Sequence, residues 1–113
     1  MTEAPMREPA FLVLTALVDE PRHGYAVIQE VQRISDGQVR LQAGTLYGVL
    51  ERLRNEGLIE VDREEVVQSR LRRYYRITAL GATRLARETE RLRKRADLAA
   101  SRLRKLALGG GAA

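Results

Sequence analysis

The last third of the chain carries a heptad repeat that is longer than the core of a small domain. Small or apolar side chains recur at alternating spacings of four and three residues, at Leu85, Thr89, Leu92, Ala96, Ala99, Leu103 and Leu106. This pattern is typical of a coiled-coil seam. A helix rises ~1.5 Å per residue, so the seam spans roughly 32 Å. Part of it can pack on the chain's own first helix, but its full length needs a partner. We therefore predict a dimerisation helix over residues 79–108 and assign Phe11 to the same interface.

The residues before this helix divide into three shorter helices and a hairpin. Apolar residues fill the run from Pro9 to Val18, which by length could be a buried strand or a buried helix. The proline at its start and its leucines favour a helix. The predicted elements are helices over residues 9–18, 24–35 and 43–56, and antiparallel strands over residues 58–64 and 72–78 with a turn from Glu65 to Leu71. The glycine-rich residues 109–113 are expected to form a disordered tail.

The third predicted helix has glycines where a helix rarely tolerates them. Gly44 and Gly48 are four residues apart and lie opposite the stripe that contains Leu46 and Leu53. Glycine inside a helix costs up to ~1 kcal/mol relative to alanine, so this bare face indicates a close approach to another surface. The major groove of DNA, about 12 Å wide, admits a helix in this way. The alternative is that the glycines receive a neighbouring helix or are tolerated at a frayed helix start.

The order of the elements predicts a mainly α (α+β) fold, a winged helix-turn-helix over residues 9–78 followed by the dimerisation helix. In such folds the second helix of the motif enters the major groove. The hairpin contains four arginines with no acid between Val66 and Ile77, interleaved with Tyr74. Such a strand suits contacts with phosphate, which position a protein without reading sequence. Its alternative interpretation is a solvated sheet face.

Composition excludes several other kinds of site. The chain has no cysteine and one histidine, His23, so neither a Cys/His nucleophile pair nor a thiolate or histidine-rich metal site can form. No glycine-rich phosphate loop occurs. We expect no enzyme activity, cofactor or metal. No apolar run approaches the ~20 residues of a membrane span and no signal peptide is present, so we expect a cytoplasmic protein.

The net charge of the chain does not locate a binding site. The formal charge is +5 and the pI about 10.2, which favours a polyanionic partner. Residues 78–113 hold nine basic and three acidic side chains, so the excess lies on the predicted dimerisation helix. Of the 20 basic residues 18 are arginine, the side chain that holds phosphate bidentately, but a codon-usage bias would produce the same count.

Three stretches of the sequence together resemble the PadR family of bacterial transcriptional regulators. They are "HGYAVIQEV", "AGTLYGVLERLRNEGLIE" and "RRYYRITALG", and the similarity covers roughly residues 11–81. The short C-terminal part resembles the compact members of the family. The resemblance implies a homodimeric transcriptional repressor that binds double-stranded DNA. A small molecule or another signal would release the protein from the DNA. The residues that it and the glycine face assign to DNA binding are Gly24, Tyr25, Gly44, Thr45, Tyr47, Gly48, Arg52, Arg72, Arg73 and Tyr74.

The sequence also departs from the pattern of this family. Ala43 and Gly48 stand where the family usually has proline, and Gln42 is a poor helix N-cap where serine is common. The hairpin lacks the usual glycines and carries Glu64 and Glu65, so we expect an acidic tip that does not enter the minor groove. Base contacts from the third helix are expected to tolerate these changes better than contacts by the tip.

Three further expectations concern the single histidine, ligands and the alternative function. We expect His23 to cap the second helix or to contact a phosphate, in preference to sensing pH. A small-molecule effector would bind at the dimer interface, between the first helices and the C-terminal helices. The alternative function is a winged-helix module that grips another protein with its hairpin and third helix, without specific DNA binding.

Overall fold

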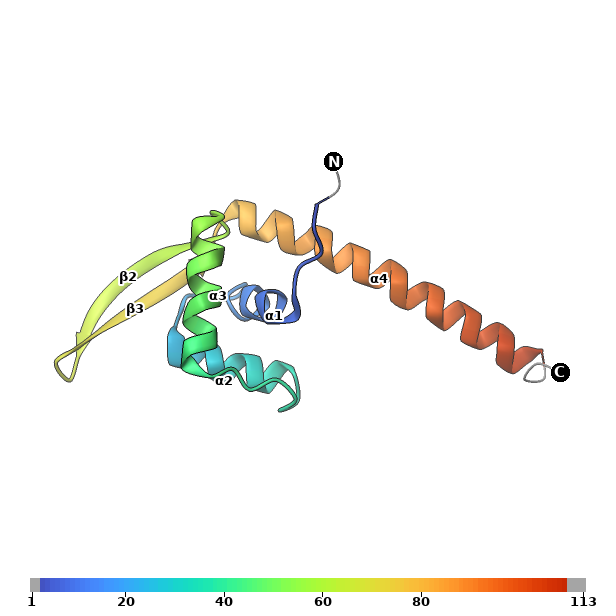
Figure 1. The fold of residues 1–113 in the computed structure, drawn as a ribbon, viewed down its shortest axis with the longest axis horizontal. Coiled ribbons are helices and arrows are strands. Elements are labelled where there is room, and N and C mark those ends of the chain that lie inside the picture. The colour runs from blue at the N-terminus through green and yellow to red at the C-terminus, as the bar shows by residue number, and fades with distance from the viewer. Residues whose placement is uncertain (1–2, 110–113) are drawn as a thin grey trace.

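The computed structural model describes residues 3–109 and contains four helices and three strands (Figure 1). In chain order these are α1 (Glu8–Ala16), β1 (Arg22–His23), α2 (Gly24–Ile34), α3 (Ala43–Asn55), β2 (Ile59–Val67), β3 (Arg70–Ile77) and α4 (Ala79–Leu108). Figure 1 shows α1, α2 and α3 grouped at the base of a long hairpin. The helix α4 extends from this group in the direction away from the hairpin. The predicted class, an α+β winged helix-turn-helix followed by a long helix, is confirmed.

The hydrophobic core lies between the three short helices and the base of the hairpin. Leu46, Leu50 and Leu53 of α3 are buried, as the predicted stripe requires. They pack with side chains of α1, α2 and the sheet, including Leu14, Leu17, Val27, Val31, Ile59 and Tyr75. Because these leucines occupy one side of α3, its other side is free to face solvent.

The short helices begin and end within two residues of the predicted positions. The helix α1 starts one residue earlier, at Glu8, and ends at Ala16, where Leu17 caps it. Leu17 is buried although it lies beyond the end of the helix. The apolar run in the sequence therefore extends past the helix, and the predicted end at Val18 was wrong. Helices α2 and α3 each end one residue earlier than predicted, because the next residue serves as the C-cap.

A third strand joins the hairpin and was not predicted. The strand β1 pairs antiparallel with β3, with Arg22 opposite Tyr75 and His23 opposite Tyr74, so the sheet order is β1-β3-β2. Two residues are too few to show the alternation that identifies a strand in a sequence. The pairing attaches the start of α2 directly to the wing, the hairpin of β2 and β3.

The tip of the wing differs from the predicted one. The strands continue to Val67 and Arg70, and the turn consists of Gln68 and Ser69 alone, both at positive φ (52° and 64°). Two left-handed residues match the twist of paired strands. Glu64 and Glu65 therefore lie along β2, opposite β3, and the predicted acidic tip is wrong. The β-branched Val66 and Val67 favour the extended pairing that moves the turn outward.

The helix α4 packs on the body only through its first turns. Thr78 caps it, with its Oγ1 accepting a hydrogen bond from the Gly81 amide at 3.0 Å. Gly81 packs so closely that a Cβ there would lie 2.0 Å from the carbonyl oxygen of Leu58, and Leu85 is buried in the protomer's own core. Later seam residues are exposed: Leu92 by 40%, Leu103 by 64% and Leu106 by 48%.

Two remaining expectations concern the ends of the chain and membranes. Of the tail predicted over residues 109–113, only Gly109 is described, and it caps α4; residues 110–113 lie outside the described residues. Among residues 3–109, no helix combines the length and the apolar character that crossing a bilayer requires.

Candidate nucleic-acid interface

The glycine face of α3 is open to solvent. A Cβ built on Gly44 or on Gly48 would meet no atom of another element within 4 Å. The alternative interpretation, that these glycines receive a neighbouring helix of the same chain, is therefore wrong. Around the two glycines the side chains of Thr45, Tyr47 and Arg52 are exposed. The structure thus presents a strip of bare backbone with polar groups at its edges.

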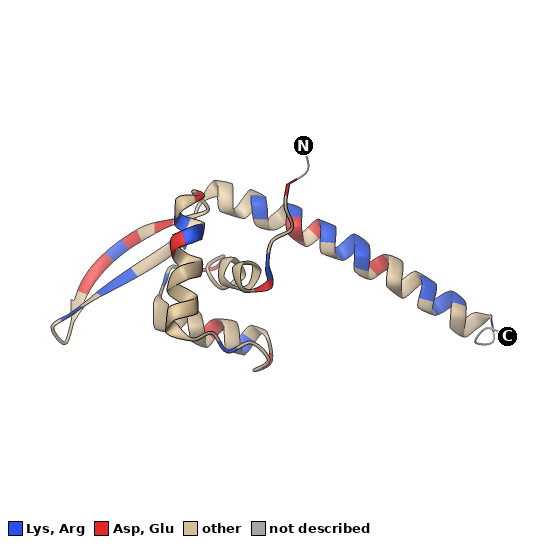
Figure 2. Cartoon of the chain, in the orientation of Figure 1, with Lys and Arg blue, Asp and Glu red and all other residues tan. Residues whose placement is uncertain are grey.

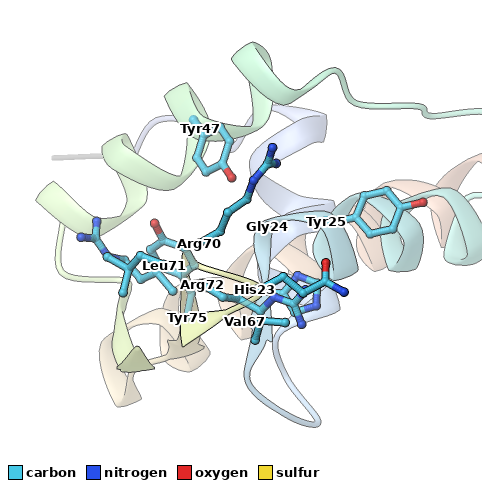
Figure 3. Close-up of a pocket in the computed structure, with 11 residues that line it drawn as sticks. His23, Gly24, Tyr25, Tyr47, Val67, Arg70, Leu71, Arg72 and Tyr75 are labelled. Carbon is cyan, nitrogen blue, oxygen red and sulfur yellow. The ribbon is translucent and has the colours of Figure 1, made fainter. Parts of the chain in front are cut away.

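Tyr47 and Arg52 lie on opposite sides of this strip. Tyr47 lines an open groove of about 990 Å³ between α3, the start of α2 and the wing (Figure 3). Arg52 lines a smaller cavity of about 250 Å³ between α3 and the start of α1. Gly44 and Gly48 border the cavity on the Arg52 side. The helix is therefore flanked by two hollows, one on each side.

The start of α2 forms the floor of the larger groove. Gly24 is buried, and a Cβ on it would lie 3.0 Å from the hydroxyl oxygen of Tyr47. The neighbouring Tyr25 is exposed and lines the same groove (Figure 3). The structure thus brings together Gly24, Tyr25 and Tyr47, three residues that the sequence assigned to one site from separate motifs.

His23 caps α2, as predicted. Its Nδ1 accepts a hydrogen bond from the backbone N–H of Ala26 at 3.3 Å, so that nitrogen carries no proton. Its ring stands edge-on to Tyr74, with centroids 5.3 Å apart. Burial lowers the pKa of His23 below its ordinary value of 6.5, the positive charge of Arg72 lowers it further, and Glu65 opposes the shift.

The arginines of the wing differ in their partners. Arg73 pairs with Glu64 at 3.3 Å, and Arg76 pairs with Glu60 at 2.8 Å and with Asp62 at 3.2 Å. Figure 2 shows the resulting mixture of acidic and basic residues along the hairpin. Among residues 3–109, Arg70 and Arg72 form no ion pair, and both line the larger groove. The sequence pattern missed this difference because the acids belong to the opposite strand.

Tyr74 is engaged within the wing. Its hydroxyl donates a hydrogen bond to Glu65 at 2.6 Å, and the guanidinium of Arg63 lies over its ring at 3.8 Å from the centroid. It is half-buried and does not line the larger groove. Of the wing residues assigned to DNA binding, Arg72 is therefore the one that combines an unpaired charge with a position in the groove.

No cluster typical of a metal site is found in the described part of the chain. Residues 3–109 contain no group of three or more His, Cys, Asp or Glu side chains arranged to hold a metal ion. The chemistry of the interface is that of guanidinium, phenol and backbone amide groups, which bind anions and base edges.

Comparisons with known proteins agree with this geometry. The model of the "Transcriptional regulator PadR-like family" matches residues 13–87. The transcriptional regulator Rv3488 of Mycobacterium tuberculosis is 36% identical over 80 residues, which cover 71% of this chain and 71% of that protein. A crystal structure of a PadR family regulator from Eggerthella lenta superimposes with a TM-score of 0.68 at 29% identity, covering 83% of this chain and 80% of that one.

A further solved structure shares the fold at lower identity. It is Bacillus subtilis PadR in complex with operator DNA, with a TM-score of 0.63 and 20% identity. The match covers 71% of this chain but only 46% of that one. The family model covers α2, α3 and the wing, which form the candidate interface, and also the start of α4. The chain belongs to the PadR-like family of transcriptional regulators.

Proposed function

We propose that the protein is a sequence-specific DNA-binding regulator that acts as a homodimeric repressor on an inverted-repeat operator. The observation that carries this proposal is the exposed glycine face of α3, which lies between two hollows that contain arginines. The related fold of Bacillus subtilis PadR was solved with operator DNA, which supports duplex DNA as the partner.

In this proposal the helix α3 lies in the major groove with Gly44 and Gly48 toward its floor. Tyr47 and Arg52, at the two edges of the bare strip, are placed to contact base edges, and Thr45 contacts them at the start of the helix. The start of α2 contacts phosphates through Gly24 and Tyr25. The wing contacts them through Arg72. Arg73 and Tyr74 contribute less than the sequence implied, because both are held by acids of β2.

The dimer of the proposal forms through α4. Leu92, Leu103 and Leu106 are exposed in one protomer although they continue the seam that begins at the buried Leu85. A second copy would cover them, with the small side chains of Thr89, Ala96 and Ala99 allowing the helices to approach. The half-buried Phe11 contributes from α1. A twofold dimer places two recognition helices on half-sites about 34–36 Å apart.

Repression, release and location complete the proposal. We propose that a small molecule or another signal releases the DNA by binding between α1 and α4 of the two protomers, which the family resemblance supports. Binding to a bacterial operator also implies a cytoplasmic protein. Transcription in vitro from a promoter that contains the bound site tests repression directly. Added protein should lower the amount of transcript, and an unchanged or raised amount would contradict a repressor.

The second candidate function is a winged-helix module that binds a protein. The ion-paired outer strand of the wing favours it, because these acids would weaken contacts with phosphate. Titration of mixed-sequence duplex DNA at several salt concentrations separates the two functions. A DNA-binding protein should show log K falling linearly with log salt, with a slope of about −0.9 per phosphate neutralised. Absence of salt-dependent binding would favour the protein-binding module.

A further inference from the structure

We propose that Arg7, held in place by an N-terminal segment that is anchored on α4, contacts the DNA backbone on the side of α3 opposite to the wing. This inference rests on the proposed function, since it adds a phosphate contact to that DNA-binding face. The N-terminal segment, residues 3–7, precedes α1, and nothing in the sequence pattern pointed to it.

The cavity beside α3 places Arg7 next to the recognition helix. It measures about 250 Å³, and Arg7 lines it together with Arg52 and the bare Gly44 and Gly48. Both arginines are exposed, and neither forms an ion pair with any residue between 3 and 109. Two positive charges without an ion-pair partner among residues 3–109 therefore face the same hollow, and the nearby Glu56 lines the adjacent cavity with them.

The N-terminal segment is fixed by contacts with residues 80 or more positions away in the sequence. Arg87 binds both carboxylate oxygens of Glu3, at 3.0 and 2.9 Å. Arg84 donates a hydrogen bond to the carbonyl oxygen of Ala4 at 2.6 Å. Glu88 of α4 is only 3% exposed and pairs with Arg84, and Arg84 also pairs with Glu3 at 3.1 Å. Residues 3 and 4 are thus each attached to α4.

Glu88 is itself held by its neighbours on α4. It accepts a hydrogen bond from Nε of Arg91 at 3.1 Å and forms an ion pair with Arg84 at 3.7 Å. These contacts compensate for the burial of its charge. The anchor is therefore a charge network in which Arg84, paired with both Glu88 and Glu3, joins the N-terminal segment to α4.

An anchored arginine is a better phosphate ligand than one on a loose terminus. Ordering a free segment on binding costs conformational entropy, which the anchored segment has already lost on folding. A guanidinium can hold a phosphate with two parallel hydrogen bonds. The walls of the major groove are sugar-phosphate backbones, and Arg70 and Arg72 already face one of them from the wing. Arg7 supplies a charge for the other wall.

The salt dependence of binding to a duplex tests the contact. Relative to wild type, Arg7→Gln should reduce the magnitude of the slope of log K against log salt by about 0.9 per protomer, which is about 1.8 for the proposed dimer, and weaken binding about fivefold to tenfold per protomer at ~0.1 M salt. Arg104→Gln removes the same charge from the exposed far part of α4 and should leave both quantities unchanged. If Arg7→Gln and Arg104→Gln behave alike while wild type binds, this contact is wrong but the proposed function stands. If wild type itself shows no salt-dependent binding, the proposed function fails.

Substitution of Glu3 tests the anchor. Glu3→Gln removes a negative charge, so long-range electrostatics alone would strengthen DNA binding. The anchored segment predicts the opposite, because the bidentate contact with Arg87 is lost and Arg7 is held less firmly. We expect a loss of affinity with an unchanged melting temperature. Binding that is as tight as wild type, or tighter, would overturn the anchoring.

Discussion

Gly24 and Tyr47 approach each other so closely that no larger residue fits at position 24 without moving the tyrosine. A Cβ on Gly24 would lie 3.0 Å from the Tyr47 hydroxyl oxygen and 3.4 Å from its Cζ. Tyr47 is 55% exposed, so its ring can move toward solvent at little cost. The first residue of α2 thereby fixes the position of a side chain on the face of α3 that we assign to DNA.

We predict that Gly24→Ala shifts Tyr47 and alters DNA recognition without unfolding the protein. The variant should melt close to wild type but bind the preferred duplex more weakly. Tyr47→Phe removes the oxygen that makes the closest contact, so the double variant Gly24→Ala/Tyr47→Phe should lose less than the sum of the single effects. Additive losses in binding assays would show that the two residues act independently.

A substitution in the wing is expected to strengthen DNA binding. Glu64 neutralises Arg73 at 3.3 Å, so Glu64→Gln should release that guanidinium for phosphate. DNA binding should become tighter, and its salt slope steeper by about 0.9 per protomer, which is about 1.8 for the proposed dimer. Glu90→Gln, which removes the same charge from an exposed position of α4, is the control. Equal salt slopes for the two variants would exclude Arg73 as a suppressed phosphate contact.

The pH dependence of stability should contain a contribution from His23. Its pKa is lowered in the folded protein by burial and by Arg72, so the unfolded chain binds the proton more readily. The contribution of His23 to the free energy of unfolding is therefore fully present above pH 6.5. It is lost as the pH falls through the lower pKa of the folded state. His23→Asn retains a capping side chain but cannot titrate. Urea unfolding should lose this pH dependence in His23→Asn, and an unchanged profile would contradict the assignment.

Assembly through α4 predicts that a charge in the seam separates the protomers. Leu92 is 40% exposed in one protomer, so Leu92→Arg is tolerated by the monomer but would be buried in the dimer. The variant should sediment as a folded monomer with about half the salt slope of wild type. Leu108→Arg, at a residue that lies off the seam, should remain dimeric. A dimeric Leu92→Arg variant would exclude this seam as the interface.

Patterns that repeat along the sequence predicted the fold well. The leucine spacing of α3 and the seam of α4 extend over several turns, and the structure confirms both helices. Gly57 follows the end of α3 with φ at 77°, a conformation that favours glycine and ends helices in this way. The exposed glycine face also followed from helical periodicity, because one buried stripe determines what lies opposite to it.

Features that depend on distant pairings could not be predicted in the same way. The ion pair of Arg73 with Glu64 requires the strand register, and the window around Arg73 shows only positive charges. The contact of Glu3 with Arg87 spans 84 residues. The two-residue strand β1 has no period at all. These three features are those that decide which arginines remain available to a partner.

The central claim is that the glycine face of α3 enters the major groove, and substitution of Gly48 tests it most directly. A side chain there meets open space, and replacing a helical glycine stabilises the fold by up to ~1 kcal/mol. Gly48→Glu and Gly48→Ala should therefore both melt at or above the wild-type temperature. Wild-type protein is first used to select its preferred duplex from a random pool, and each variant is then titrated with that duplex. We expect Gly48→Glu to lose binding, since it places a carboxylate against the DNA, and Gly48→Ala to keep most of it. A folded Gly48→Glu variant that binds the selected duplex as tightly as wild type would show that the glycine face does not enter the groove.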